Sequence, residues 1–368
     1  LLPELSRHVD ELSLLRGLYT TNLTHEPALY KYHSGSEFTG RPSLGAWITW
    51  GLGSENQNLP GYVVLEDPQG LPVNGVDNWT SGFLPASFQG TRFRATGAPV
   101  LNVSPDFVEP ASVTAVERQL IRRLDRLHQQ NRAGQSRLES RIEAWELAAR
   151  MQTSATDALD LSQETAATLE LYGIGREPTD SYGRRCLIAR RLVERGVRFV
   201  QLFINSQIWD NHSSIGTALP AACARTDRPI AGLLTDLKQR GLLDDTLVVW
   251  CGEFGRLPIA QTGGKPGRDH NPHHLVCWLA GGGVRGGGKN PNVGEAAVKF
   301  VTVAADHIER VVPVANTDSL LHPGCIRFYL LTNKCIYAGQ EQVKYLDDGT
   351  SPWLEVFQKG NDVIAEMR

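Results

Sequence analysis

The sequence predicts an α/β fold with a mainly parallel sheet that helices cover on both faces. Three observations support this prediction. Strand-like apolar runs alternate with helical segments in the second half of the chain, and such units form parallel sheets buried between helices. The 368 residues are 41% hydrophobic, enough for a large core. Acids and histidines gather where predicted strands end, which is where such sheets bind ligands.

The first hundred residues contain few regular elements. Residues 3–18 are predicted to form an amphipathic helix, because apolar residues recur at helical spacing. Residues 19–60 are rich in glycine, proline, serine and threonine around a short helical piece at 44–52. The apolar run at 61–67 is bounded by turn residues and predicts a buried strand. Residues 68–100 carry many turn signals and are expected to be irregular.

A helical insertion is predicted at residues 111–171. This segment is charged and almost free of glycine, and leucine and isoleucine recur every three or four residues, which indicates two or three long helices. Arginines and glutamates at 118–141 are typical of a solvated helix face rather than of a nucleic-acid site.

The alternation of helices and strands follows the insertion. We expect helices at 183–195 and 221–241, the second ending at Gly241 as a C-cap. The apolar runs at 197–205, 246–251 and 274–279 predict strands. A glycine-rich run follows the last of them.

The bulk composition excludes several classes of function. A formal net charge of -3 gives no electrostatic basis for nucleic-acid binding. No apolar run reaches the roughly 18 residues of a membrane span. The six cysteines form no CxxC pair and are expected to be mostly buried free thiols, which do not decide the redox compartment. No signal peptide precedes Leu1, so we expect a processed or incomplete chain. A homo-oligomer is left open.

Two candidate sites follow predicted strands. Asp210 and His212 come after the strand at 197–205, and an Asp-x-His pair can place a carboxylate and an imidazole on one cation; the alternative is a carboxylate that orients a histidine. Glu253 directly follows a buried strand, where a carboxylate is costly unless it is paired or metal-bound. Arg256 is its alternative partner, or a clamp for phosphate or sulfate.

The segment at 267–274, Gly-Arg-Asp-His-Asn-Pro-His-His, is the densest group of candidate ligands. It places three histidines within five residues beside Arg268 and Asp269. Either at least one of His270, His273 and His274 has a ligand-binding or catalytic role, or the segment is a hydrogen-bonded loop corner. The glycine run at 281–288 either approaches an anion with its amides or packs closely.

Several strings together resemble one family. They are HEPALYKYHSG (25–35), RPSLGAWITWGLGSENQNLPGYVVL (41–65), GFLPASFQGTRFR (82–94), WDNH (209–212), LLTDLKQRGLLDDTLVVWCGEFGR (233–256), GRDHNPH (267–273) and WLAGGGVRGG (278–287). This pattern resembles the bacterial sulfatase-like proteins of unknown function within the alkaline phosphatase superfamily, over residues 1–288.

The resemblance implies a three-layer α/β/α fold around a large, mostly parallel sheet. It also implies hydrolysis of phosphate or sulfate esters with one or two divalent metals, and a periplasmic or exported location. Under it, Asp210 and His212 lie in the metal region and His270 resembles the late histidine of the site. Glu253 stands where related enzymes often carry an Asp-His pair, and Phe254 replaces the imidazole.

The chain also departs from the family pattern. The usual first strand with its Gly-Gly-Pro-Ser segment is absent, because the chain begins at Leu1 beyond that point. His25 stands where sulfatases carry the cysteine that becomes formylglycine, which argues against that chemistry. Residues 289–368 diverge from the family pattern, and only Asp318 and His322 weakly resemble one of its motifs.

The leading hypothesis is therefore a single sulfatase-like domain that hydrolyses a small-molecule or glycan phosphate or sulfate ester. A divalent metal, namely zinc, calcium, magnesium or manganese, would be held by Asp210, His212, Glu253, Asp269, His270 and His274. Catalytic roles fall to His25 as nucleophile or proton donor and to Arg256 and Arg268 as anion-binding groups. The alternative is a non-catalytic secreted or surface protein, for binding or assembly, that retains the fold. Trp47, Trp50 and Trp79 are expected in the core rather than in a carbohydrate site.

Overall fold

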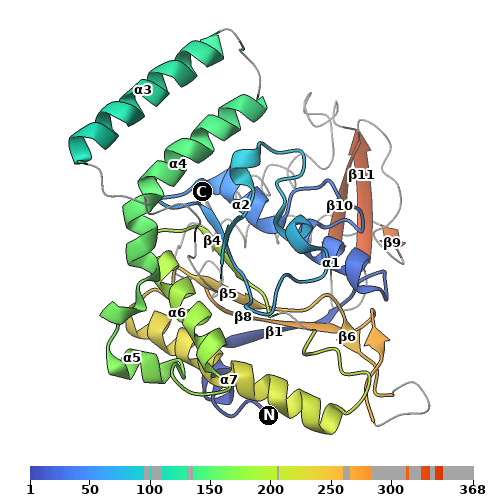
Figure 1. Ribbon diagram of the computed structural model, residues 1–368. Coiled ribbons are helices and arrows are strands. Elements are labelled where there is room, and N and C mark those ends of the chain that lie inside the picture. Colours follow the sequence, from blue (N-terminus) through green and yellow to red (C-terminus); the bar gives the residue numbers. More distant parts are fainter. Residues whose placement is uncertain are drawn as a thin grey trace. The chain divides into compact units, whose positions relative to one another are not determined.

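The computed structural model describes residues 1–94, 100, 110–130, 132, 136–204, 207–259 and 266–282, and three further strands between 312 and 342 (Figure 1). The chain divides into two units, Leu1–Gly281 and Gly282–Arg368. All the predicted site residues lie in the first unit.

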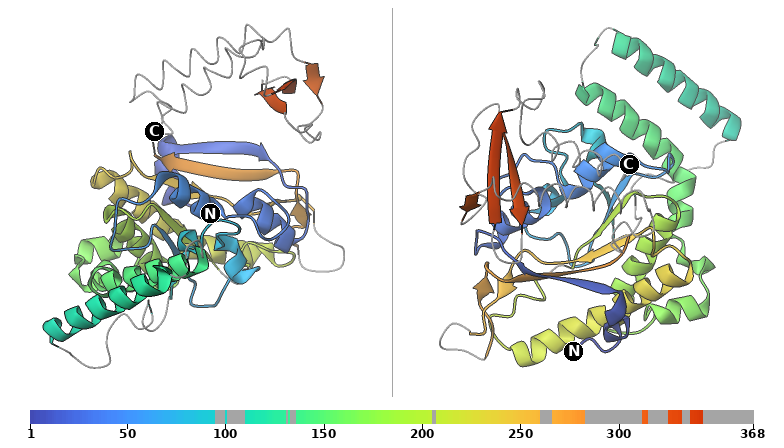
Figure 2. Two further views of the ribbon diagram at one scale, coloured as in Figure 1. Left: turned by 90° about the horizontal axis from the view of Figure 1, so that it is seen from above. Right: turned by 180° about the vertical axis from the view of Figure 1, so that it is seen from behind.

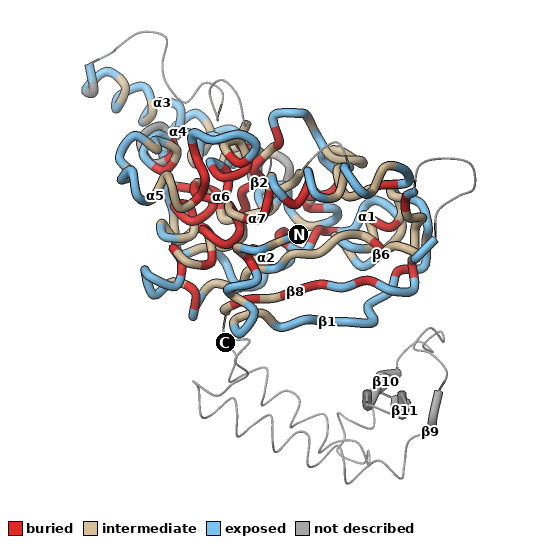
Figure 3. The backbone as a smooth tube through the Cα atoms, turned by 90° about the horizontal axis from the view of Figure 1, so that it is seen from below, coloured by how far each residue is buried: buried red, intermediate tan, exposed pale blue. Residues whose placement is uncertain are grey.

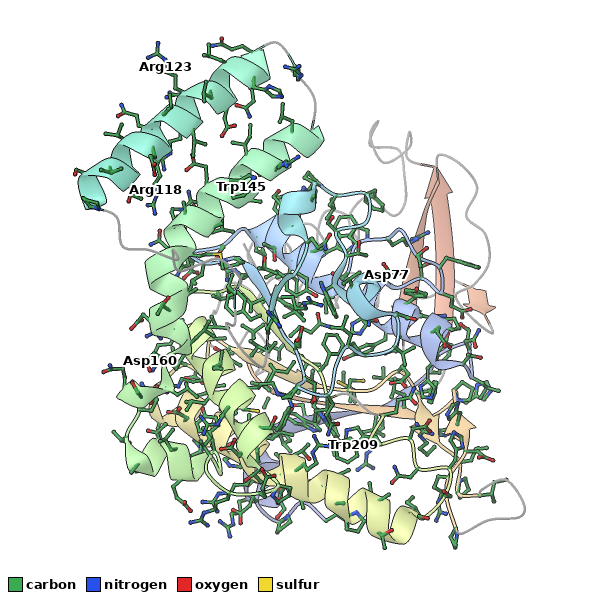
Figure 4. All side chains as sticks on the ribbon, viewed as in Figure 1. Asp77, Arg118, Arg123, Trp145, Asp160 and Trp209 are labelled. Atoms are coloured by element: carbon green, nitrogen blue, oxygen red, sulfur yellow. The ribbon has the colours of Figure 1, made fainter. Side chains whose placement is uncertain are left out.

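The predicted helical insertion consists of two long helices and a short one. They are α3 (Ala111–Gln130), α4 (Ser136–Leu159) and α5 (Ala166–Leu171), with a 3-10 turn at Leu161–Gln163. Arg122 on α3 forms a forked ion pair with Glu146 on α4. Figure 4 shows the side chains of both helices, among them the exposed Trp145. The helical prediction for this segment is confirmed.

Two helices, α6 (Asp180–Glu194) and α7 (Ile215–Gln239), pack against each other over the core. Helix α7 starts six residues earlier than the sequence suggested. Pro220 is the sixth residue of this helix, which therefore continues through a residue without a backbone N–H. Gly241 adopts the left-handed conformation with φ 71° just past the helix end, which confirms its capping role.

One sheet of the first unit is parallel, and its middle strand is buried. Strand β2 (Tyr62–Leu65) lies between β3 (Thr91–Phe93) and β4 (Phe199–Leu202). Both pairings are parallel. The strands expected at 61–67 and 197–205 are therefore confirmed.

The two faces of β2 pack against different parts of the chain. Val63 and Leu65 belong to a core cluster with side chains of α4 and α6. Tyr62 and Val64 point to the opposite face, because side chains alternate along a strand, and there they pack with the buried Trp79. Burial on both faces accounts for the uninterrupted apolar sequence of this strand.

A buried ion pair joins the ends of β2 and β4 to α6. Arg185 on α6 donates to Asp67, just after β2, at 2.7 Å, and also to the carbonyl oxygen of Phe203, just after β4. Both charged side chains are almost fully buried. The pair fixes the start of the segment that leads from β4 to Asp210.

A second sheet is antiparallel. Its middle strand β8 (Leu275–Gly281) lies between β1 (Leu12–Leu18) and β5 (Leu247–Trp250). One face, which includes Trp278 and Ala280, packs on side chains of α6 and α7. Figure 3 shows β1 as a largely exposed strand beside the more buried β8.

The expected helix at 3–18 was wrong. Residues Leu5–Glu11 form a 3-10 helix, η1, and the rest of the segment is β1. Leucine-rich spacing suits a helix and a strand alike, and here Leu12–Leu15 and Leu18 pair with β8, with an irregular register between Leu15 and Leu18. The views in Figure 2 show the two strands side by side.

The expectation of a mainly parallel sheet holds for β3–β2–β4 and was wrong for β5 and β8. Parallel neighbours need a crossover connection, usually a helix. In its described part, the connection from β5 to β8 contains only the short antiparallel pair β6 (Gly255–Arg256) and β7 (His270–Asn271).

The direction of β8 decides which segments meet. Leu18 at the end of β1 lies opposite Leu275, and Trp250 at the end of β5 lies opposite Trp278. Strand β8 therefore begins at the edge of the sheet where β1 and β5 end. The segment before β8 is thus brought to the segments that follow β1 and β5.

The glycine run leaves from the opposite edge. Gly281 pairs with Leu247 at the start of β5. It has φ 71°, and a Cβ atom there would lie 2.2 Å from the carbonyl oxygen of Leu243, so close packing accounts for this glycine. Residues 283–288 of the run lie outside the described residues.

Two helices complete the first unit, α1 (His25–Ser34) and α2 (Leu44–Leu52), with short 3-10 turns at Gly75–Trp79 (η2) and Ala86–Phe88 (η3). Helix α2 confirms the short helical piece expected at 44–52.

The core assignment of three tryptophans is only partly correct. Trp79 is buried, but Trp47 and Trp50 are 39% and 53% exposed on α2. The structure packs the other side of α2 against the β2 region. None of the helices among the described residues has the length and apolar character of a bilayer-spanning segment.

The second unit contains an antiparallel sheet. Its strand order is β10 (Cys325–Leu331), β11 (Ile336–Gln342), β9 (Val312–Val314). Asp318 and His322, which weakly resemble a family motif, lie outside the described residues.

Candidate functional site

Four segments that are distant in sequence meet beside the antiparallel sheet. The segment after β1 leads to His25, the first residue of α1, and the one after β4 leads to Asp210. The segment after β5 carries Glu253, and the one before β8 carries His270. Three backbone hydrogen bonds, each of 2.8 Å, join these segments. The amide of Thr20 donates to the carbonyl oxygen of Pro272, that of Arg268 to Asn211, and that of Leu257 to Asp269.

Two glycines permit this close approach. A Cβ atom on Gly255 would lie 1.5 Å from the carbonyl oxygen of His274, and one on Gly267 would lie 1.9 Å from that of His212. No side chain fits at such distances, so both positions require glycine. The glycines around the candidate ligands thus serve close packing of backbone on backbone.

Asp210 contacts four basic side chains. Its Oδ1 accepts a hydrogen bond from Arg256 and lies 3.0 Å from Nε2 of His212 and 3.2 Å from Nε2 of His270. Its Oδ2 lies 3.0 Å from Nε2 of His25. Burial alone would raise the pKa of this carboxyl, but the charge and hydrogen bond of Arg256, with His25 and His212, lower it below its usual value.

His25 lies between two carboxylates. Its Nδ1 is 2.6 Å from Oε1 of Glu253, and its Nε2 faces Asp210. Both ring nitrogens are therefore engaged by acids. This arrangement suits a proton carrier held by both carboxylates better than a nucleophile, because a nucleophile needs a free nitrogen lone pair.

The partners of His212 and His270 define their tautomers. Nδ1 of His270 is 2.6 Å from the carbonyl oxygen of Leu23, and Nδ1 of His212 is 3.0 Å from Oδ1 of Asp269. Both acceptors require a proton on Nδ1, so each neutral ring presents a lone pair on Nε2. The two Nε2 atoms are 3.0 Å apart.

Three electron-pair donors therefore face one another: Nε2 of His212, Nε2 of His270 and Oδ1 of Asp210. They repel one another unless a proton or a cation lies among them. Ligands about 2.0–2.2 Å from a zinc ion stand roughly 2.9–3.4 Å apart in common geometries, and these atoms are 3.0–3.2 Å apart. His25, Asp210 and His270 also offer one ligand atom each within 4.8 Å of one another. The residues present fit a divalent cation.

The outer contacts of the two histidines have the form found at metal sites. Asp269 accepts from His212, and the Leu23 carbonyl oxygen accepts from His270. A carboxylate or a carbonyl on the far nitrogen of a ligating histidine fixes its tautomer and ring orientation. In the structure Asp269 contacts Nδ1 of His212, so it can orient that ring; its role as a direct metal ligand stays a prediction.

Phe254 lies against the rings of this cluster. It is only 6% exposed, and its ring centroid is 5.0 Å from that of His25 and 4.2 Å from that of His270. The Arg256 guanidinium lies 5.3 Å from the same ring. Phe254 is thus an apolar support for the charged side chains.

The structure brings together seven of the nine predicted site residues: His25, Asp210, His212, Glu253, Arg256, Asp269 and His270. Arg268 instead donates to the carbonyl oxygen of Gly267. His274 is exposed, and among the described residues its side chain has no hydrogen bond or ion pair with the cluster. The Leu23 carbonyl was missed, and no sequence signal marks a backbone acceptor of this kind.

A cavity of about 390 Å³ lies elsewhere, between η1 and α7, and includes His8, Arg228 and Thr235 in its lining. It contains none of the predicted site residues. The cluster itself lies near the surface, with the His212 side chain 44% exposed and that of Asp210 13% exposed.

Comparison with known proteins identifies a family. A family model described as "Protein of unknown function (DUF1501)" matches residues 1–316. No curated protein and no solved structure matches the chain.

Proposed function

The chain belongs to the DUF1501 family, whose function is unknown, and we propose that it is a metal-dependent hydrolase of phosphate or sulfate esters. The substrate would be a small-molecule or glycan ester. The observation that carries the proposal is the convergence of Asp210, His212 and His270 on one point through atoms that all present electron pairs.

Asp210, His212 and His270 would hold the ion. Two imidazoles with one carboxylate favour zinc over calcium or magnesium, which prefer sets of oxygen ligands. When bound, a divalent ion would polarise the ester oxygen and lower the pKa of a water molecule.

The protein's own groups would supply the remaining functions. Arg256 uses one of its donors on Asp210, and the others can bind the anionic ester. His25, held by Glu253 through Nδ1, can carry a proton at Nε2. Of the two roles considered for His25, nucleophile and proton donor, we propose the proton donor, because both of its nitrogens face carboxylates.

The same proposal includes the superfamily and the location. A parallel sheet with α4 and α6 on one face is compatible with a divergent three-layer α/β/α fold of the alkaline phosphatase superfamily. The quoted sequence strings support that relationship. A periplasmic or exported location follows from the same resemblance.

The first test measures metal binding and activity together. Chelator-treated protein is titrated with zinc, manganese, magnesium or calcium ions, and hydrolysis of aryl phosphates and aryl sulfates is then assayed. We expect one or two equivalents of metal to bind and His270→Ala to lower the affinity at least 100-fold, since it removes a ligand. His273→Ala, an exposed histidine in the same loop, is the matched control and is expected to bind metal like the wild type.

Two results would count against the proposal. One is a wild-type chain that binds none of the four ions at micromolar concentration. The other is a chain that binds metal but hydrolyses neither class of ester. That result would support the metal site and contradict the proposed hydrolase activity.

One observation favours the non-catalytic alternative. Arg256 already places a positive charge on Oδ1 of Asp210, and His25 can neutralise Asp210 and Glu253 by carrying a second proton. The cluster would then be an ion-pair network that holds four segments together in a binding or assembly protein. In that case the isolated chain binds no metal, and His270→Ala lowers its thermal stability instead.

A further inference from the structure

Two cysteines lie on neighbouring strands beside the candidate site. Strands β5 and β8 are antiparallel, with Trp250 opposite Trp278. The next residues along this register are Cys251 and Cys277. Cys251 stands two residues before Glu253, and Cys277 three residues after His274.

The two thiols contact each other. Each thiol affects the pKa of the other, so the two lie near each other. Their own hydrogen bonds go to backbone carbonyl oxygens: Cys251 donates to Gly252, and Cys277 to Trp278. Directly opposed residues of an antiparallel pair have Cα atoms about 4.5–5.5 Å apart, within the 4.4–6.8 Å that a disulfide spans.

Other cysteines of the described residues lack this arrangement. Cys186 is buried in α6 and Cys223 in α7, and neither has another cysteine opposite it on a paired strand. The pair is therefore a specific feature of the sheet that carries the site.

We propose that Cys251 and Cys277 are a disulfide-forming pair that links the end of β5 to β8 beside the candidate site. The bond would close a loop of about 26 residues that contains Glu253, Arg256, Asp269 and His270. It would hold the two ends of this site-bearing loop together whether or not a metal binds.

The chemistry requires a disulfide as the oxidant, such as oxidised glutathione. One protein thiolate attacks a glutathione sulfur, and reduced glutathione leaves. The second protein thiolate then attacks the protein sulfur of this mixed disulfide, and a second reduced glutathione leaves. The two protein thiols lose two electrons, which reduce the glutathione disulfide, and their two protons end on the two glutathione thiols.

Burial of the two thiols slows this exchange in the folded protein. Burial raises the pKa of the Cys251 thiol to about 12 and also raises the pKa of Cys277, so little thiolate exists there. We expect the bond to form rapidly during refolding and slowly in the folded state.

Peptide mapping tests the proposal directly. The wild-type chain is unfolded, refolded in a mixture of reduced and oxidised glutathione, blocked with an alkylating agent and digested with trypsin. Cleavage after Arg240, Arg256, Arg268 and Arg285 yields peptides 241–256 and 269–285, each with a single cysteine. The expected result is one linked species of the two peptides, lighter than their sum by two hydrogens.

Two variants sharpen the test. Cys277→Ser is expected to lose the linked species, and Cys223→Ser to retain it. Oxidised wild-type protein should melt about 5 °C or more above the reduced protein, and this difference should vanish in Cys277→Ser. If both wild-type peptides are fully alkylated after oxidative refolding, or if Cys251 links to another cysteine, the proposal is overturned. Neither outcome bears on metal binding.

Discussion

Asp210 shows how one residue organises the candidate site. Its carboxylate meets His25, Arg256 and His270 from three other segments, and His212 two residues further along its own. The Asp-x-His spacing indicated a metal site or a hydrogen-bonded pair. The structure adds that both histidines beside Oδ1 have their Nδ1 atoms occupied by acceptors, which leaves the electron pairs of Nε2 for a cation.

The Asp269→Ala variant tests whether Asp269 orients the ring of His212. Asp269→Ala removes the acceptor of the Nδ1 proton, so the ring can turn and change tautomer. We expect the dissociation constant for zinc to rise roughly 10–100-fold, the usual effect of losing such a partner. Isothermal titration calorimetry measures it. Asp245→Ala, an exposed acid away from the cluster, is the control, and equal affinities in both variants would show that Asp269 has no orienting role.

At the scale of elements, the antiparallel direction of β8 decides which segments meet. It brings the segment before β8 to the same edge as those after β1 and β5. The backbones then approach so closely that Gly255 and Gly267 leave no room for a side chain. The geometry of the site therefore depends on loop packing as much as on its charged residues.

Gly267→Ala tests this packing. The added methyl group would lie 1.9 Å from the carbonyl oxygen of His212, so the loop must move, at a cost of about 1–3 kcal/mol in the free energy of unfolding. We expect weaker zinc binding as well. Gly216→Ala is the matched control, because that helical glycine has no atom within 4 Å of the added Cβ. Urea unfolding measures both variants, and a Gly267→Ala protein as stable as the control would contradict this packing.

At the scale of the whole molecule, stability should depend on pH through buried groups. Burial lowers the pKa of His33 from 6.5 to about 4, and its Nε2 has no hydrogen-bond partner among the described residues. Glu164 and Asp210 have pKa values below the ordinary range: burial alone would raise them, but arginine partners outweigh it.

Acidification destabilises the fold through all three groups. Below pH 6.5 the unfolded chain protonates at His33 and the folded chain does not, so the free energy of unfolding falls by up to about 1.4 kcal/mol per pH unit until pH 4. The two carboxylates contribute stability above their ordinary pKa values, and it is lost as pH falls through the lowered ones. Stability should therefore be highest above pH 6.5.

His33→Gln isolates the first of these effects. Urea unfolding at pH 7.5, 6, 5 and 4 should show a smaller loss of stability for the variant than for the wild type between pH 6.5 and 4. Below pH 4 the two proteins should lose stability in parallel, because the carboxylates are unchanged. Identical curves throughout would show that His33 is not a buried neutral histidine.

The sequence by itself determined the elements whose patterns are local. Strand β2 was predictable because it is buried on both faces and so is uniformly apolar, and α3 and α4 because glycine is almost absent over a periodic pattern. It also indicated which side chains are candidate ligands for a cation. Only the tertiary structure decided that β1 is a strand, that β8 is antiparallel, and that His274 and Arg268 stay outside the cluster. The physical reason is that pairing partners and strand directions depend on contacts between segments far apart in the chain, and no local pattern of residues encodes those contacts.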